Sequence, residues 1–298
     1  MQPIVETVPN FSEGRNREVI EAIVEPFRSI DGVKLLDYSS DPNHNRLVVT
    51  AAGRPEAVKQ ALLEAMTKAV ERIDLRTHRG QHPRMGAVDV VPFIPVKDMT
   101  MADAVALSKE LAAEASERLC LPVFLYEESA SAPHRRNLAD IRKGQFEGMA
   151  EKLFLPEWHP DYGPGRPHPT AGVTAVGARM PLIAYNINLG TDRLDIAQSI
   201  ARSIRHISGG LRYCKALGVR LEERNLVQVS MNLTDYTRTA LYRAFELVRI
   251  EAERWGVPVV GSEIVGLVPL AALVDAARYY LRLEDFSENQ ILETRLWE

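Results

Sequence analysis

The chain has 298 residues, which is long for one domain and suits two domains of roughly 150 residues each. Hydrophobic residues make up 46% and charged residues 26%, an ordinary globular composition with enough apolar material for a core. The 36 Lys and Arg residues against 40 Asp and Glu residues give a net charge of −4 without a block of like charges, so neither nucleic acid nor an anionic membrane surface is expected as the main partner.

The first third of the sequence alternates strand-like and helix-like segments. Apolar residues at helical spacing predict a helix over 17–30, which Pro26 is expected to kink or shorten, and a longer helix from Val58 to Ile73. Runs rich in β-branched residues predict strands over 3–9, 33–38, 45–52 and 87–96. The resulting order is strand, helix, strand, strand, helix, strand.

The middle of the chain predicts a helix over 101–118, a strand over 121–128 and a helical run over 134–153. The next segment, 155–179, contains five prolines and four glycines, a composition that predicts neither a helix nor a central strand. A plain linker is one interpretation. The Trp, Tyr and His residues of the segment favour a ligand-binding role instead, because loops at domain junctions often carry binding sites.

The order of the first third returns near the C-terminus. Helices are predicted over 191–207 and 238–254, between strands over 181–189, 216–222, 226–234 and 257–265. Two βαββαβ units predict an α+β fold of two ferredoxin-like subdomains, 1–178 and 179–298, each an antiparallel sheet with its helices on one face. We expect the ligand to lie in a cleft or tunnel between the two subdomains.

The expected compartment is the cytoplasm. Cys120 and Cys214 are the only cysteines, which fits a reducing environment, and residues 1–11 resemble no secretion signal. No run of 18 apolar residues occurs, so no membrane-spanning segment is expected.

His78 and His82 are spaced like a pair of zinc ligands on a helix. The zinc motif requires Glu after the first His, where this chain has Arg79, and Gly80 and Pro83 would break the helix. The sequence therefore predicts no metal site here. His82 alone, in a loop before a strand, remains either a general base with an ordinary pKa near 6.5 or a turn residue.

Four stretches of the sequence are long enough to be compared with known families: VPNFSEGRNREVI (8–20), HPRMGAVDVVPFIPV (82–96), NLVQVSMNLTD (225–235) and VVGSEIVGLVP (259–269). Together they resemble glutamate formimidoyltransferases, the folate-dependent enzymes of histidine breakdown. The resemblance covers essentially the whole chain. In many animals this domain is fused to a cyclodeaminase, for which 298 residues leave no room, so the resemblance implies the transferase activity alone.

The resemblance implies that a formimidoyl group moves between N-formimidoyl-L-glutamate and tetrahydrofolate, giving 5-formimidoyltetrahydrofolate and L-glutamate. It implies tetrahydrofolate as co-substrate, a homodimer, and small molecules as the only other partners. No nucleotide-binding loop or cysteine cluster occurs, so neither a nucleotide nor a metal cofactor is expected.

The same resemblance places roles on particular residues. His82, in HPRMGA, corresponds to the catalytic base of the family. The folate-binding stretch corresponds to Gly163, Pro164, Gly165, Arg166, Pro167, His168, Pro169, Thr170, Ala171 and Gly172. The chain departs from the animal pattern at Ser39, where animal members have Asp, so we expect Asp37 or Asp41 as the acid partner of His82.

Supporting roles are expected for residues that could hold anionic groups or close over the substrate. Arginines are needed for the carboxylates of glutamate and folate, and Arg46, Arg84 and Arg179 are the candidates; each could equally be a surface or structural arginine. Asn10 lies in NFSEG (10–14), which is either a substrate-closing loop or a simple helix cap.

Two alternative functions remain open from the sequence. The first is a glutamate formyltransferase acting on 5-formyltetrahydrofolate, because formyl and formimidoyl differ only by O in place of NH. The second is a folate-binding paralogue without turnover, against which the presence of His82 argues.

Overall fold

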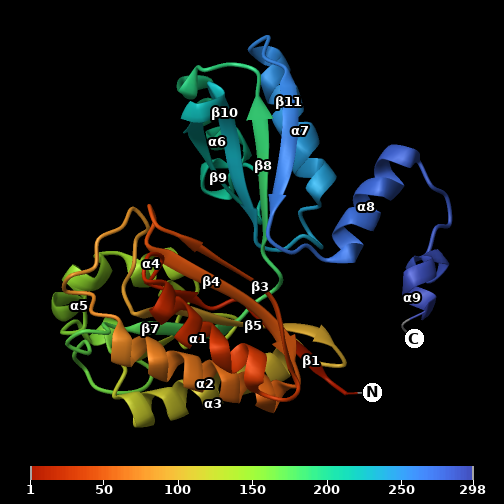
Figure 1. The fold of residues 1–298 in the computed structure, drawn as a ribbon. Helices are drawn as coiled ribbons and strands as arrows, with labels where there is room; N and C mark the ends of the chain where they lie inside the picture. Colours follow the sequence, from red (N-terminus) through yellow and green to blue (C-terminus); the bar gives the residue numbers. More distant parts are fainter. Residues whose placement is uncertain (1, 297–298) are drawn as a thin grey trace. The chain divides into compact units, whose positions relative to one another are not determined.

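The structure is a computed structural model that describes residues 2–296 (Figure 1). The chain divides after Arg179 into two compact units, each with its own core. Among the described residues, no helix has both the length and the apolarity that a membrane crossing requires.

The N-terminal unit follows the predicted order through its first elements. Its helices are α1 (Arg17–Ser29), α2 (Pro55–Arg72), α3 (Met101–Leu119), α4 (Leu138–Arg142) and α5 (Gln145–Lys152). Its strands are β1 (Ile4–Thr7), β2 (Asn10–Phe11), β3 (Val33–Asp41), β4 (Arg46–Gly53), β5 (Val88–Lys97), β6 (Val123–Glu127) and β7 (Thr174–Ala178). Short 3-10 helices cover Pro133–Arg135 and Pro156–Trp158.

Local signals explain why the first helix forms where it does. The side chain of Asn16 accepts hydrogen bonds from the backbone N–H groups of Glu18 and Val19, which caps the N-terminus of α1. Pro26 lies inside the helix, which nevertheless ends at Ser29, within one residue of the predicted end. The apolar face of α1 is buried in the core that α1, α2 and α3 form against the sheet (Figure 1).

The sheet of this unit corrects two predictions. Strand β7 lies between β5 and β6 and pairs in parallel with both, so the sheet is mixed rather than antiparallel. Consequently the segment 155–179 does contain a central strand, in which all five residues are buried. Its prolines all precede residue 170, so the composition of the whole segment masked a short apolar strand at its end.

The helical run predicted over 134–153 is interrupted. Helix α4 ends at Arg142, and α5 begins after Gly144, whose φ of +94° is a conformation that glycine adopts easily. Ile141 of α4 and Met149 of α5 pack on the face of the sheet opposite α1–α3, against Phe124 and Val90. This second layer covers only part of that face.

The C-terminal unit has the predicted βαββαβ order. It consists of β8 (Ile183–Leu189), α6 (Leu194–Ile204), β9 (Cys214–Leu221), β10 (Leu226–Leu233), α7 (Leu241–Arg254) and β11 (Val259–Val265). These strands form an antiparallel sheet in the order β11-β8-β10-β9, and α6 and α7 cover one face. Two further helices, α8 (Leu270–Leu281) and α9 (Leu292–Leu296), follow, and neither of them was predicted.

Candidate active site

Strand register places several of the predicted residues on one face of the N-terminal sheet. In β4, Leu47, Val49 and Ala51 enter the core under α1–α3, so Arg46 points to the opposite face. Asp41 pairs with Arg46, and residues directly opposite in an antiparallel pair share a face.

The same argument applies to the other two predicted residues on these strands. Asp37 pairs with Thr50, and Asn10 pairs with Val48; both partners alternate with the core residues of β4. Four predicted supporting residues therefore share the face that α1–α3 leave uncovered: Asn10, Asp37, Asp41 and Arg46.

The loop that carries His82 is attached to the turn between β3 and β4. The N–H of Gln81 donates to the carbonyl of Asn43, and a Cβ on Gly80 would lie 2.3 Å from the carbonyl oxygen of His44. The ring of His44 stands edge-on to that of His82, with 6.5 Å between the ring centroids. The loop thus holds the half-buried imidazole of His82 near His44 and Arg46, at the end of the β3–β4 hairpin.

The electrostatics around His82 differ from the expectation of an ordinary pKa. Burial, followed by the positive charges of Arg46 and Arg142, lowers the pKa of His82 from 6.5 to about 3. The imidazole is therefore uncharged at neutral pH, and it is a weaker base than the sequence alone suggests.

Arg142 is the functional candidate that the sequence analysis missed. It is the last residue of α4, and its Nη2 lies 2.5 Å from Oδ2 of Asp89, whose side chain is 2% exposed. The other oxygen of Asp89 accepts a hydrogen bond from the N–H of Met85 at 2.7 Å. Asp89 therefore joins α4 to the HPRMGA segment. An acidic residue in an otherwise apolar buried strand was the available signal, since buried charges are usually paired.

Arg46 is a partly buried cation that has no counterion among the described residues. Among residues 2–296, no carboxylate lies within ion-pair distance of its guanidinium, and its buried Nε has no hydrogen-bond partner. Burial and the nearby charge of Arg142 both lower the pKa of Arg46. The two guanidinium groups and His82 thus form a local concentration of basic groups.

Asp37 and Asp41 are the two candidates for the acid partner of His82, and Asp41 is engaged elsewhere. Oδ2 of Asp41 lies 3.0 Å from Nδ1 of His44, and Oδ1 accepts hydrogen bonds from the N–H groups of Asn43 and His44. These bonds, led by that from the backbone of His44, lower the pKa of Asp41. Asp37 is exposed on β3. Between residues 2 and 296, neither carboxylate forms a hydrogen bond or ion pair with His82.

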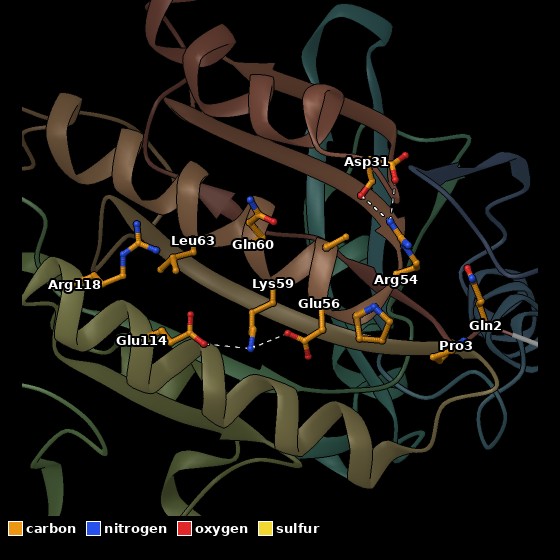
Figure 2. Close-up of a pocket in the computed structure, with 12 residues that line it drawn as sticks. Gln2, Pro3, Asp31, Arg54, Glu56, Lys59, Gln60, Leu63, Glu114 and Arg118 are labelled. Atoms are coloured by element: carbon orange, nitrogen blue, oxygen red, sulfur yellow. Dashed lines mark hydrogen bonds and ion pairs between the residues drawn. The ribbon is translucent and has the colours of Figure 1, made fainter.

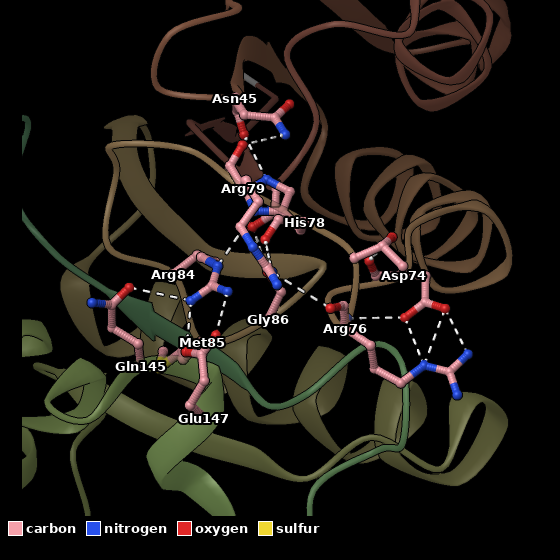
Figure 3. A network of polar contacts seen from close by, with 12 residues as sticks. Asn45, Asp74, Arg76, His78, Arg79, Arg84, Met85, Gly86, Gln145 and Glu147 are labelled. Carbon is pink, nitrogen blue, oxygen red and sulfur yellow. Dashed lines mark hydrogen bonds and ion pairs between the residues drawn. The ribbon is translucent and has the colours of Figure 1, made fainter.

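Arg84 belongs to an internal network rather than to the uncovered face (Figure 3). Its guanidinium donates to both carboxylate oxygens of Glu147, at 2.7 and 2.8 Å, and to Gln145 at 3.2 Å. Its Nε donates to Nδ1 of the buried His78, whose Nε2 lies 3.0 Å from the carbonyl of Asn45. His78 and Arg84 therefore fasten the loop before β5 to α5 and to the start of β4.

The stretch Gly163–Gly172 is a compact loop fixed at both ends. Gly163 and Gly172 have φ of +89° and +70°, and a Cβ on Gly172 would lie 2.2 Å from the carbonyl oxygen of Met85. Nδ1 of His168 accepts a hydrogen bond from the N–H of Ala171, whose carbonyl in turn accepts from Ala87. The end of the loop therefore lies against the HPRMGA segment, and Arg166 near its middle is exposed.

A large hollow elsewhere on this unit is not the predicted site. It measures about 780 Å³, lies along α2 and α3, and includes none of the predicted residues (Figure 2). Lys59 in this hollow forms ion pairs with Glu56, Glu110 and Glu114, so its charge is already balanced. Within residues 2–296, no three His, Cys, Asp or Glu side chains are grouped so that they could hold a metal ion.

Comparison with known proteins covers both units. Residues 4–179 match the sequence profile of the formiminotransferase domain, N-terminal subdomain, and residues 184–295 match that of the formiminotransferase domain. A glutamate formimidoyltransferase of Streptococcus pyogenes serotype M1 is 54% identical over 99% of each chain, and one of Thermoplasma acidophilum is 47% identical over 98% of this chain and 97% of its own. The formimidoyltransferase-cyclodeaminase of Rattus norvegicus is 46% identical over 94% of this chain but only 53% of its own length.

Proposed function

This chain belongs to the formiminotransferase domain family, and we propose that it is a glutamate formimidoyltransferase of histidine degradation. It transfers the formimidoyl group of N-formimidoyl-L-glutamate to tetrahydrofolate. The observation that carries the proposal is the identity of 54% over 99% of both chains with a protein named for this activity. The uncovered sheet face beside His82, with its basic groups, supports it because both substrates are anionic.

The proposed reaction balances with one proton carrier. N5 of tetrahydrofolate attacks the formimino carbon, and a tetrahedral intermediate forms. His82 takes the proton from N5 and delivers it to the nitrogen of glutamate, after which the bond between that nitrogen and the carbon breaks. His82 is unprotonated at neutral pH, as the first of these steps requires.

The proposed folate site is the loop Gly163–Gly172. The carbonyl of Ala171 accepts a hydrogen bond from Ala87, and Val173, directly after the loop, donates to the carbonyl of Met85. The end of the loop therefore lies beside residues that follow His82 closely in sequence, and its middle residues are accessible to a ligand. Tetrahydrofolate is a co-substrate in this proposal, and the chemistry needs neither a metal nor a nucleotide. We also propose that the protein is a cytoplasmic homodimer that binds neither nucleic acid nor membrane, on the strength of the family resemblance, the charge balance and the cysteine usage.

The His82→Ala variant tests the proposed base. Because general-base catalysis contributes about 100-fold or more, we expect turnover to fall by at least that factor while folate binding stays measurable. The His206→Ala variant, which alters an exposed histidine of the C-terminal unit, is the control. Near-normal turnover in His82→Ala would remove His82 from the base role. Assays with both N-formimidoyl-L-glutamate and 5-formyltetrahydrofolate plus glutamate would identify the transferred group.

A further inference from the structure

We propose that Arg46 and Arg142 together bind the α-carboxylate of the glutamate-derived substrate, and that Asp89 positions Arg142 for this contact. The inference rests on the proposed function and adds the site of the second substrate to it. It starts from three groups on separate elements: Arg46 at the start of β4, Arg142 at the end of α4 and Asp89 in β5.

The unpaired state of Arg46 points to an anionic ligand. A guanidinium that is partly removed from water without a carboxylate is unfavourable, and a second guanidinium nearby increases the cost. Asp41 and Asp89 act on Arg46 only from a distance, because Asp41 is bound to His44 and Asp89 to Arg142. A bound carboxylate would supply the counterion that the described residues lack.

Arg142 is held firmly but retains free donors. It donates to Asp89 through Nη2, while its buried Nε has no hydrogen-bond partner in the part of the chain that the structure describes. The ammonium of Lys152 donates to the carbonyls of Asp140 and Ile141, both at 2.6 Å, and to that of Lys143 at 3.2 Å. These bonds fix the end of α4, so that Arg142 presents a preorganised guanidinium.

The chemistry of the two substrates indicates that the carboxylate bound by Arg46 and Arg142 is the α-carboxylate of the glutamate derivative. In N-formimidoyl-L-glutamate this carboxylate is two bonds from the nitrogen that receives the proton, so it must lie close to His82. In tetrahydrofolate the p-aminobenzoyl group separates N5 from the glutamate tail, so the tail carboxylates lie far from the reacting atoms. An anion site beside His82 therefore suits the amino-acid substrate, and two guanidinium groups suit a planar carboxylate.

Binding at this site would also strengthen the base. After burial, the groups that lower the pKa of His82 are the guanidinium groups of Arg46 and Arg142, followed by the neighbouring histidines His44 and His78. A substrate carboxylate on the guanidinium groups offsets their repulsion, so the pKa of His82 rises toward neutrality when the substrate is bound. Asp41 and Asp89, the neighbouring carboxylates, are already engaged in the free protein.

The experiment compares two ligands on matched variants. L-Glutamate carries the α-carboxylate, and γ-aminobutyrate is the same chain without it. Binding of each is measured by calorimetry on the wild type, on Arg142→Gln and on the control Arg136→Gln, which removes an exposed arginine paired with Glu128. We expect Arg142→Gln to weaken L-glutamate binding by about 10- to 100-fold and γ-aminobutyrate binding little, while Arg136→Gln changes neither.

Kinetics and a second variant complete the test. In Arg142→Gln the KM for N-formimidoyl-L-glutamate should rise by a similar factor while the KM for tetrahydrofolate stays within about twofold. If loss of the Asp89 ion pair prevents folding, Arg46→Gln gives the same comparison, because Arg46 has no ion pair within residues 2–296 to lose. Suppose that the wild type binds L-glutamate and that the variants keep the same ratio of affinities for L-glutamate and γ-aminobutyrate. This result would overturn the present inference but not the proposed function. A wild type that neither binds L-glutamate nor converts its formimidoyl derivative would overturn the proposed function itself.

Discussion

Replacing His82 by Gln should make the N-terminal unit more resistant to acid. In the folded protein the pKa of His82 is about 3, whereas in the unfolded chain it is near 6.5. Above pH 6.5 neither state binds the proton, so His82 has no effect on stability. As the pH falls below 6.5, His82 becomes protonated in the unfolded chain but stays unprotonated in the folded protein. The free energy of unfolding therefore decreases until about pH 3.

The size of this effect follows from the two pKa values. One pH unit corresponds to about 1.4 kcal/mol, so at pH 4.5 the destabilisation is at most about 2.7 kcal/mol. Part of the imidazole is exposed to solvent, which screens the neighbouring charges, and we therefore expect about 1–2 kcal/mol. The His82→Gln variant lacks this loss of unfolding free energy at pH 4.5. At pH 7.5 protonation of His82 does not affect the unfolding free energy, so the substitution has no effect through titration there.

Hydrogen exchange in increasing urea, read on peptides from β5 (Val88–Lys97), reports the stability of this unit separately from the other. The quantity to compare is the difference in unfolding free energy between pH 7.5 and pH 4.5, which cancels any loss of packing in the variant. The His206→Gln variant, with one exposed histidine fewer, should behave like the wild type. If His82→Gln lost as much stability in acid as the wild type does, the basic surroundings that we assign to His82 would be wrong.

Two further predictions concern the folate loop and the absence of a metal requirement. Gly172→Ala should lower the unfolding free energy by about 2–4 kcal/mol in a thermal or urea melt, because its φ is +70° and its Cβ would meet the carbonyl of Met85. Gly148→Ala, in α5 with open space around the new methyl group, should instead be neutral or stabilise by up to about 1 kcal/mol. Turnover should survive dialysis against a chelator unchanged; loss of activity that zinc restores would bring back a metal role for His78 and His82.

Local patterns in the sequence predicted the helices and most of the strands. Periodicity of apolar residues depends on neighbours within a few turns, so α1, α2 and both βαββαβ orders could be derived from it. Gly80 and Pro83 alone exclude a helical histidine pair, and that conclusion needed no tertiary information. Strand β7 was missed because its five residues follow a segment dominated by proline and glycine.

Only the tertiary structure decided the pKa of His82 and which residues lie near it. Arg142 and Asp89 are 53 residues apart in sequence, and the residues around each of them do not predict that the two form an ion pair. The pKa of His82 depends on its burial and on the charges that β4 and α4 bring close to it. Neither of these can be derived from the residue type alone. The sequence by itself therefore identified the candidate base and the loops around it. Chain packing decided that Arg84 is internal, that no carboxylate of the described residues pairs with Arg46, and that the pKa of His82 is strongly lowered. The physical reason is that electrostatic energies depend on distances and burial, which only the folded chain defines.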